Sequence, residues 1–143
     1  MPHPLRTMSE RPLSSGVGKW FVSASSLVIS LAVYVFTAAP SLTWAHWGSD
    51  GGDFVTAAVT GRVPHPPGFP LYWLLTRLSV RWFRGDPAET LNLFSAVMAS
   101  LAVGLTARAV FDDAESVWTG GVTGLTLAFA PLFWSQALIT EVY

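Results

Sequence analysis

Residues 20–39 form a stretch of twenty amino acids, WFVSASSLVISLAVYVFTAA, without a charged side chain. As an α-helix this stretch would be roughly 30 Å long, which matches the hydrocarbon core of a bilayer. The whole chain fits that environment, because 51% of its residues are hydrophobic and only 12% are charged. A cleaved signal peptide is the alternative, but its apolar region would usually be about 7–15 residues long. The sequence therefore predicts an integral membrane protein.

Two further apolar stretches, residues 91–111 and 117–138, predict additional transmembrane helices. The first is rich in Ala, Ser and Gly, which suits close packing of helices in a bundle. The second contains Pro131, which predicts a kink or a broken helix in its later half. Residues 1–19 are polar and rich in Pro and Ser, as in a disordered cytoplasmic lead-in. We expect an all-α integral membrane fold with about three transmembrane helices, built from residues 20–143.

The connection between the first two spans, residues 40–90, is expected to contain short helices at the membrane interface. Within it, residues 71–83 carry Arg77 and Arg81 four positions apart, together with Trp73 and Trp82. This pattern is typical of an amphipathic helix lying at headgroup depth. A short second span is the alternative, and the two arginines argue against it.

The basic residues are evenly divided between the two predicted sides, so the flanks of the first span decide its orientation. Three Lys or Arg residues precede the span, and no Lys or Arg follows it until Arg62. This asymmetry predicts a cytoplasmic N-terminus and an extracytoplasmic loop 40–90. After two more spans the chain would bring Glu141 back to the side of that loop, where Asp50, Asp53 and His65 lie.

The composition excludes several kinds of site. A net charge of −1 excludes a protein that grips nucleic acid through bulk electrostatics. The chain has no cysteine, which excludes disulfides, a thiolate nucleophile and Cys-type zinc sites. Residues 139–143 follow an apolar run without a helix-stop signal. This ending predicts a fragment of a longer protein, and a complete small three-span protein is the alternative.

The segment Gly48-Ser49-Asp50-Gly51-Gly52-Asp53 places two carboxylates three residues apart. If a helix begins at Gly51, Asp50 could cap it and Asp53 could complete a capping box, which would be a purely structural use. The functional alternative is a carboxylate general base at a membrane surface, made more basic by partial desolvation. A divalent cation site is also compatible with this spacing, although two acids alone are weak evidence for one.

The segment Pro64-His65-Pro66-Pro67-Gly68-Phe69-Pro70 is less generic. Its four prolines fix the backbone, and Gly68 allows a positive φ or the close approach of a ligand. One of the X–Pro bonds is a candidate for the cis form. A rigid turn with an incidental histidine is one interpretation. The other is that the rigid frame directs His65 toward a substrate group such as a phosphate.

The remaining candidates are charged side chains near helix ends. Glu141 could be a solvated charge after the last span or a member of the site in the loop. Arg77, Arg81 and Arg84 could reach lipid phosphates or bind a lipid-linked donor.

The motifs SDGGDF, VPHPPGFPLYWLL, NLFSAV and PLFWSQALITEVY occur in this order. In this the chain resembles the bacterial domain-of-unknown-function 2723 group and its animal relative, the transmembrane protein 260 type of protein O-mannosyltransferase. The resemblance covers roughly residues 40–143. It implies the GT-C architecture, in which this chain would be the N-terminal part of a larger helix bundle in a bacterial inner membrane. It also implies a long first extracytoplasmic loop and a lipid-linked sugar donor.

By this resemblance, Asp50 matches the aspartate of a G-D-S-G-E pattern, and Asp53 stands where the family usually has Glu. His65 belongs to an H-P-P-G-Y-P signature, in which Phe69 replaces Tyr, and Glu141 begins an E-V-Y motif. The implied catalytic residues are Asp50, His65 and Glu141. The implied substrate-binding residues are Gly52, Asp53, Pro66, Pro67, Gly68 and Tyr143. Arg77 is a further substrate-binding candidate, from the basic pattern described above. No metal ligand is implied.

The expected function is transfer of a sugar, plausibly mannose, from a polyprenyl phosphate to a hydroxyl of an extracytoplasmic acceptor. Asp50 would be the general base, His65 would stabilise the departing phosphate, and Glu141 would orient the acceptor or the histidine. The expected partners are the lipid bilayer, the donor lipid and a secreted or surface acceptor protein or glycan. A transporter or lipid-handling protein and a non-catalytic membrane scaffold are the alternatives.

Overall fold

The computed structural model describes residues 13–141, and this part of the chain contains helices and no strand. The predicted all-α fold is therefore confirmed. The elements are, in order, α1 (Leu13–Thr37), the 3-10 turn η1 (Ala45–Trp47), α2 (Gly51–Thr60), α3 (Pro70–Trp82), α4 (Pro87–Ala114), α5 (Val117–Ala128) and α6 (Pro131–Ala137).

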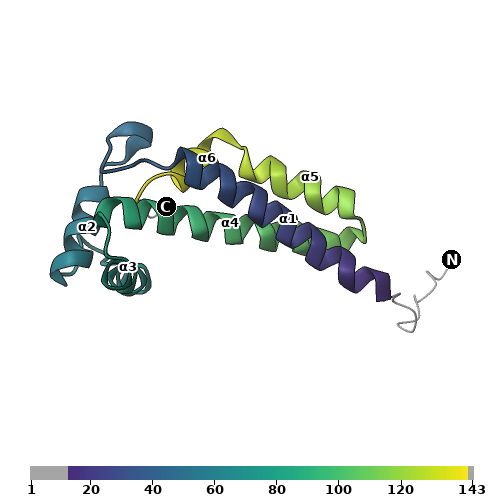
Figure 1. Ribbon diagram of the computed structural model, residues 1–143, viewed down its shortest axis with the longest axis horizontal. Coiled ribbons are helices and arrows are strands. Elements are labelled where there is room, and N and C mark those ends of the chain that lie inside the picture. The colour runs from purple at the N-terminus through teal and green to yellow at the C-terminus, as the bar shows by residue number, and fades with distance from the viewer. Residues whose placement is uncertain (1–12, 142–143) are drawn as a thin grey trace.

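The helices α1, α4 and α5 lie side by side along the long axis of the molecule (Figure 1). Both α1 and α4 are long and apolar enough to cross a membrane. A third span results if α5 and α6 are counted together, and these two helices are bent by 66° at their junction. The break predicted at Pro131 is thus confirmed, because this proline begins α6.

Two helix boundaries differ from the sequence prediction. Helix α1 begins at Leu13, so residues 13–19 are helical and not part of the expected disordered lead-in, whose residues 1–12 lie outside the described part. Helix α4 begins at Pro87, four residues before the predicted span, because Asp86 caps it. The carboxylate of Asp86 accepts hydrogen bonds from the backbone N–H groups of Ala88 and Glu89.

Small residues allow α4 and α5 to pack with their backbones in close contact. A Cβ atom on Gly120 would lie 2.6 Å from the carbonyl oxygen of Ala107, and one on Gly124 would lie 2.8 Å from the Cβ of Ala107. The hydroxyl of Tyr34 joins α1 to this pair by donating to the carbonyl of Ala128 at 2.7 Å. The bundle is therefore held by backbone proximity, as expected for helices packed in lipid.

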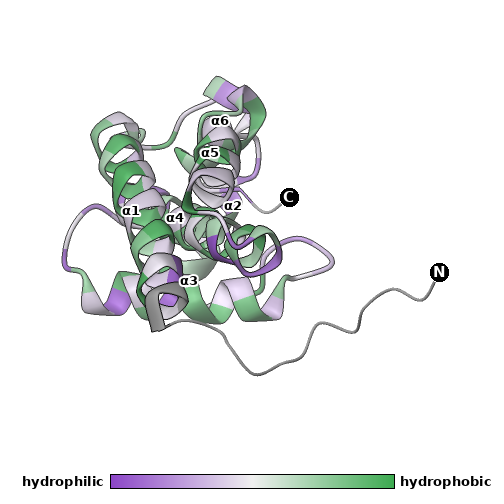
Figure 2. Cartoon of the chain, turned by 90° about the vertical axis from the view of Figure 1, so that its right-hand side faces the viewer, coloured by the Kyte–Doolittle hydropathy of each residue, from purple (hydrophilic) through white to green (hydrophobic). Residues whose placement is uncertain are grey.

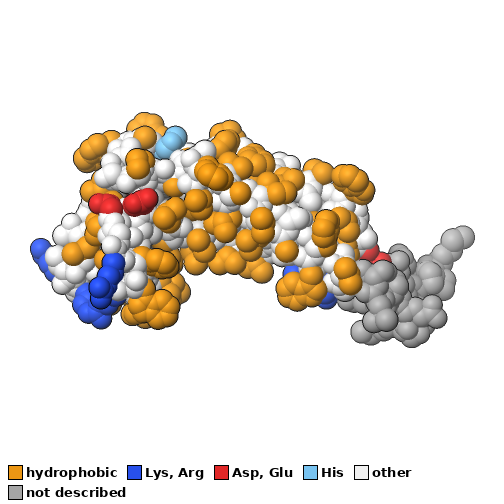
Figure 3. All heavy atoms as spheres, viewed as in Figure 1, with side chains coloured by type: hydrophobic (Ala, Val, Ile, Leu, Met, Phe, Trp, Pro, Cys, Tyr) orange, Lys and Arg blue, Asp and Glu red, His pale blue; other side chains and the backbone are white. Residues whose placement is uncertain are grey.

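Helices α2 and α3 form one end of the molecule. Figure 1 shows α3 end-on, and Figure 2 shows it running across the end of the bundle. The predicted amphipathic helix 71–83 is present as α3, which exposes an apolar ridge of Leu71, Leu74, Leu75 and Leu78. On the face shown in Figure 3, charged side chains gather at the two ends of the molecule and are absent from its middle. This distribution is that of a membrane-spanning bundle with a polar cap.

Candidate functional site at the end of the bundle

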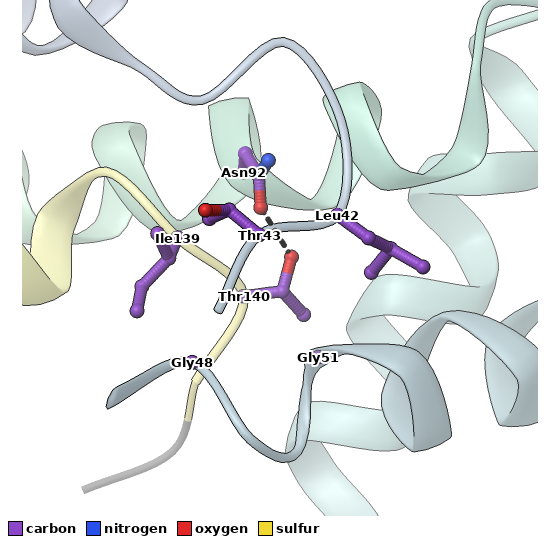
Figure 4. A pocket seen from close by; sticks show the side chains of 7 residues that line it. All are labelled: Leu42, Thr43, Gly48, Gly51, Asn92, Ile139 and Thr140. Atoms are coloured by element: carbon purple, nitrogen blue, oxygen red, sulfur yellow. Dashed lines mark hydrogen bonds between the residues drawn. The ribbon is translucent and has the colours of Figure 1, made fainter. Parts of the chain in front are cut away.

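A buried asparagine joins the start of the loop to the C-terminal segment. Asn92, in the first turns of α4, donates from Nδ2 to the carbonyls of Ala39 at 2.8 Å and Ser41 at 3.1 Å. Its Oδ1 accepts a hydrogen bond of 2.6 Å from the hydroxyl of Thr140 (Figure 4). The backbone N–H of Ala39 also donates to the carbonyl of Leu138 at 3.1 Å. These bonds place residues 39–51 and 138–141 side by side.

A small pocket lies where these two segments meet (Figure 4). It encloses about 10 Å³, roughly the space of one water molecule. Its lining residues are Leu42, Thr43, Gly48, Gly51, Asn92, Ile139 and Thr140. A sugar does not fit there, so this pocket belongs to the joint between the segments and not to a substrate site.

Glu141 binds the backbone at the start of α2. Its Oε1 accepts a hydrogen bond of 3.0 Å from the backbone N–H of Asp50. Burial raises the pKa of Glu141, the N–H of Asp50 lowers it, and the negative charge of Asp50 raises it again. Glu141 thus contacts the loop at Asp50, and its role in a site stays a prediction.

Asp53 holds the histidine of the proline-rich turn. Its Oδ2 accepts hydrogen bonds from the backbone N–H of His65 and from Nδ1 of the same residue, each at 2.8 Å. The backbone N–H lowers the pKa of Asp53 most, followed by the side-chain bond. The ring of His65 is therefore held with its Nδ1 directed at a carboxylate.

The capping box that the spacing of the two acids allowed is not formed. Asp50 occupies the N-cap position of α2, but its side chain makes no capping hydrogen bond. Its backbone lies in the right-handed helical region, with φ −95° and ψ −10°, where a capping side chain would usually require an extended backbone. Asp53 turns to His65 and does not reach back to residue 50. Neither carboxylate therefore caps α2.

The imidazole of His65 lies between the two acids. Its Nε2 is 3.6 Å from Oδ2 of Asp50, and its Nδ1 is 2.8 Å from Oδ2 of Asp53. The side chains of Asp50, Asp53 and His65 are 33%, 48% and 40% exposed. The group is therefore ordered by its internal contacts and remains partly exposed to solvent.

The HPPG turn fixes the ring from behind. The Pro66–Pro67 peptide is cis, as the sequence predicted for one X–Pro bond, and Gly68 has the predicted positive φ of 84°. The N–H of Gly68 donates to the carbonyl of His65 at 2.9 Å, which closes the turn. The ring of Phe54 packs 5.4 Å from that of His65. The turn thus holds the ring between Asp53 and Asp50, and the direction of His65 toward a substrate group stays a prediction.

The other predicted substrate-binding residues differ in their surroundings. A Cβ on Gly52 would meet no atom within 4 Å, and Pro66 and Pro67 are exposed. The guanidinium of Arg77 packs against Gly61, which caps the opposite end of α2 from Asp50. Tyr143 lies outside the described residues. Within residues 13–141, no group of three or more His, Asp or Glu side chains is arranged to hold a metal ion.

Sequence reasoning missed the polar residues behind the cluster. Asn92 lies at the joint, and the ring of Tyr72 packs against Phe54 and against Phe94, the neighbour of Ser95 in sequence. None of the three was a candidate. A buried asparagine near the start of an apolar helix is a signal that could have identified the first. Tyr72 and Ser95 carry no comparable local signal.

The comparison with known families decides the assignment. The family described as the protein O-mannosyl-transferase TMEM260 N-terminal domain matches residues 50–143, about two thirds of the chain. The chain belongs to this family. The matched region begins at Asp50 and includes His65 and Glu141, so the whole cluster falls within the TMEM260 N-terminal domain.

Two named relatives support the family assignment. The chain is 31% identical over 134 residues to the protein O-mannosyl-transferase TMEM260 of Mus musculus, covering 91% of the chain and 19% of that protein. It is 26% identical over 121 residues to the Dictyostelium discoideum protein of the same name, covering 78% of the chain and 13% of that protein. The chain thus spans less than a fifth of the length of either relative. No solved structure matches the chain.

Proposed function

We propose that this chain supplies the acceptor-activating part of a membrane protein O-mannosyltransferase, with Asp50 as the general base. The names of the two relatives indicate the reaction class. The observation that carries the residue assignment is the environment of Asp50. Its backbone is fixed by Glu141, its carboxylate faces Nε2 of His65, and a third of its side chain is exposed.

The proposed reaction is a direct displacement. The oxygen of an acceptor hydroxyl attacks the anomeric carbon of a polyprenyl-phosphate mannose, and Asp50 takes the hydroxyl proton. The bond from that carbon to the phosphate oxygen breaks, and its electron pair leaves with the polyprenyl phosphate. The configuration at the anomeric carbon is inverted, and no covalent enzyme intermediate forms. A positioned base usually contributes a factor of about 10²–10⁴ to such a step.

His65 would provide the positive charge beside the reacting atoms. The bond from its Nδ1 to Asp53 fixes the ring, which leaves Nε2 facing Asp50. In its protonated form, His65 would offset the negative charge that develops on the departing phosphate. Glu141 contacts the backbone of Asp50, so we assign it to orienting the base.

We further propose that the cluster lies on the extracytoplasmic side. The argument is the basic flank before the first span, together with the absence of Lys and Arg from residues 20–61. A lipid-linked donor could then approach from the bilayer while the acceptor approaches from the aqueous side, where the cluster is open.

The test uses the full-length protein in nanodiscs and radiolabelled polyprenyl-phosphate mannose with an acceptor protein. Asp50→Asn should lower transfer at least 100-fold, the lower end of a general base's usual contribution. Asp113→Asn, an exposed acid at the far end of α4, is the matched control and should leave transfer unchanged. Transfer close to the wild-type rate in Asp50→Asn would refute the assignment. Transfer from a nucleotide-linked mannose alone would refute the proposed donor.

A further inference from the structure

Helix α3 has three distinct sides. Tyr72, Thr76 and Val80 follow one another at intervals of four residues, so they share the side that packs against α2 and α4. The apolar ridge lies on the opposite side, where the exposed fraction of its side chains runs from 36% at Leu75 to 70% at Leu71. A continuous apolar surface of this kind marks a binding surface, so the ridge calls for a partner outside the described part of the chain.

Basic side chains border this ridge. Arg81 comes three residues after Leu78 and therefore lies beside it on the surface of the helix. Arg84 follows two residues after the end of α3, and Trp82, at that end, is 84% exposed. Residues 54–85 contain four arginines and no Asp or Glu. The stretch of chain that carries the ridge thus has positive side chains and no negative ones.

The arginines at this end of the molecule differ in what they contact. The guanidinium of Arg77 lies over the ring of Trp73, 5.5 Å from its centroid, and packs against Gly61. Arg81 and Arg84 are exposed and form no ion pair with any described residue. Arg77 therefore belongs to the contact between α2 and α3, whereas Arg81 and Arg84 are available to an anion.

The direction of α3 matches the plane of a membrane surface. Helices α1 and α4 are the candidate spans, and α3 runs across the end of the bundle that they form (Figure 1 and Figure 2). Basic side chains lie next to hydrophobic ones at this end of the molecule (Figure 3). Amphipathic helices at a bilayer surface bury their apolar side at the boundary between headgroups and acyl chains, and their basic residues attract anionic lipids.

We propose that α3 and the turn after it form a docking surface for anionic phospholipids, with the apolar ridge at the acyl chains and Arg81 and Arg84 on lipid phosphates. Charge complementarity selects this partner, because both arginines lack an ion pair and their own segment carries no acid. A guanidinium can bind phosphate oxygens through two parallel N–H donors. Each basic residue near an anionic membrane surface contributes about a fivefold gain in affinity. The inference concerns the bilayer and stands whether or not Asp50 is the base.

The test places the full-length protein in nanodiscs of phosphatidylcholine alone or of an equal mixture with phosphatidylglycerol. The readout is the amide hydrogen exchange of residues 71–84, which reports how firmly α3 is held. Exchange should be roughly tenfold slower in the mixed discs, because two arginines bind anionic headgroups there. High salt should remove most of this difference, because it screens exposed charges.

The variants separate the arginines from charge in general. The double variant Arg81→Gln, Arg84→Gln should abolish the difference between the two kinds of disc. The double variant Arg81→Lys, Arg84→Lys keeps both positive charges and should preserve most of it. Lys19→Gln removes a positive charge from α1 at the other end of the molecule and should leave the difference unchanged (Figure 1).

Three results would overturn the inference. Equal exchange in the two kinds of disc would do so, and is the result expected if a further segment of the full-length protein covers the ridge. A difference that persists in Arg81→Gln, Arg84→Gln would show that these arginines do not bind the anionic lipid. Slower exchange on adding polyprenyl phosphate to phosphatidylcholine discs, without an effect of phosphatidylglycerol, would assign the two arginines to the donor lipid instead.

Discussion

The backbone N–H of Asp50 donates a 3.0 Å hydrogen bond to Oε1 of Glu141, across 91 positions of sequence. This bond joins the first loop to the segment that follows the third predicted span. A backbone donor can be moved only with the chain that carries it. The position of the Asp50 carboxylate therefore depends on a residue that arrives from the other end of the chain.

Replacing Glu141 should separate orientation from charge. Glu141→Gln retains an oxygen that can accept the N–H of Asp50, whereas Glu141→Ala removes it. We expect transfer to fall by roughly 100-fold in Glu141→Ala, the scale of an ångström-sized misplacement, and by less in Glu141→Gln. Equal losses in the two variants, measured in the labelled-mannose assay, would show that the charge matters and the hydrogen bond does not.

The same residue gives a pH dependence of stability. The pKa of Glu141 is raised above its usual 4.5, so the folded state binds this proton more tightly than the unfolded state does. The resulting stabilisation is complete below pH 4.5 and is lost as pH rises through the folded pKa. Relative to Glu141→Gln, the wild-type melting temperature should therefore rise as the pH is lowered from 7 toward 4.5. A constant difference across that range would contradict the pKa shift.

Asp53 should hold the HPPG turn. Asp53→Ala removes the acceptor of both bonds from His65, so amide hydrogens of residues 62–69 should exchange faster while α2 stays protected. Because the pKa of Asp53 is lowered, the wild-type bonds persist above the usual value of 3.8 and are lost only as pH falls through the lower, folded value. Asp113→Ala is the control. Unchanged exchange in Asp53→Ala would place the rigidity in the prolines alone.

Two glycines near Asp50 should respond oppositely to alanine. A Cβ on Gly48 would lie 2.7 Å from the carbonyl oxygen of Thr43, whereas one on Gly52 would meet nothing within 4 Å. Gly48→Ala should lower the free energy of unfolding by about 1–3 kcal/mol, and Gly52→Ala should be neutral or slightly stabilising. Thermal unfolding in detergent distinguishes them. If Gly52→Ala lowers transfer without lowering stability, Gly52 approaches the substrate, as the family pattern implies.

Asn92 should be costly to replace. Asn92→Leu leaves the carbonyls of Ala39 and Ser41 and the hydroxyl of Thr140 without their partner. We expect a loss of about 3 kcal/mol, since each unsatisfied buried group costs about 1–3 kcal/mol. Thr140→Val should lose part of this stability, whereas Thr140→Ser should keep the hydrogen bond to Asn92. If Asn92→Leu melts at the wild-type temperature, the hydrogen bonds of Asn92 do not stabilise the fold as described above.

The sequence predicted the elements well because their signals are local. The uncharged run 20–39, the proline at 131 and the pattern of Arg77 and Arg81 can each be recognised within one continuous stretch of the chain. Counting spans also predicted that Glu141 would share a membrane face with Asp50. The structure shows these two residues in contact.

The pairing within the cluster could not be predicted from sequence. From sequence, Asp50 and Asp53 fit the two positions of a capping box as well as they fit a functional site. Only the path of the HPPG turn brings His65 close enough to bind Asp53. Tyr72 and Ser95 lie on different helices, and their proximity depends on how α3 crosses the end of the bundle. The boundary of α4 was missed for a simpler reason, because its capped first turn is more polar than the span that follows.

The bonds of Asn92 have a geometric consequence for the position of the chemistry. They fix Ala39, two residues beyond the end of α1, to the segment that carries Glu141. The number of residues in the first span therefore sets where Asp50 lies along the axis of the bundle. Inserting a helical turn into α1 would shift the cluster along the bundle without changing any residue of the cluster, and under the proposed function it would move the cluster away from the proposed lipid-linked donor.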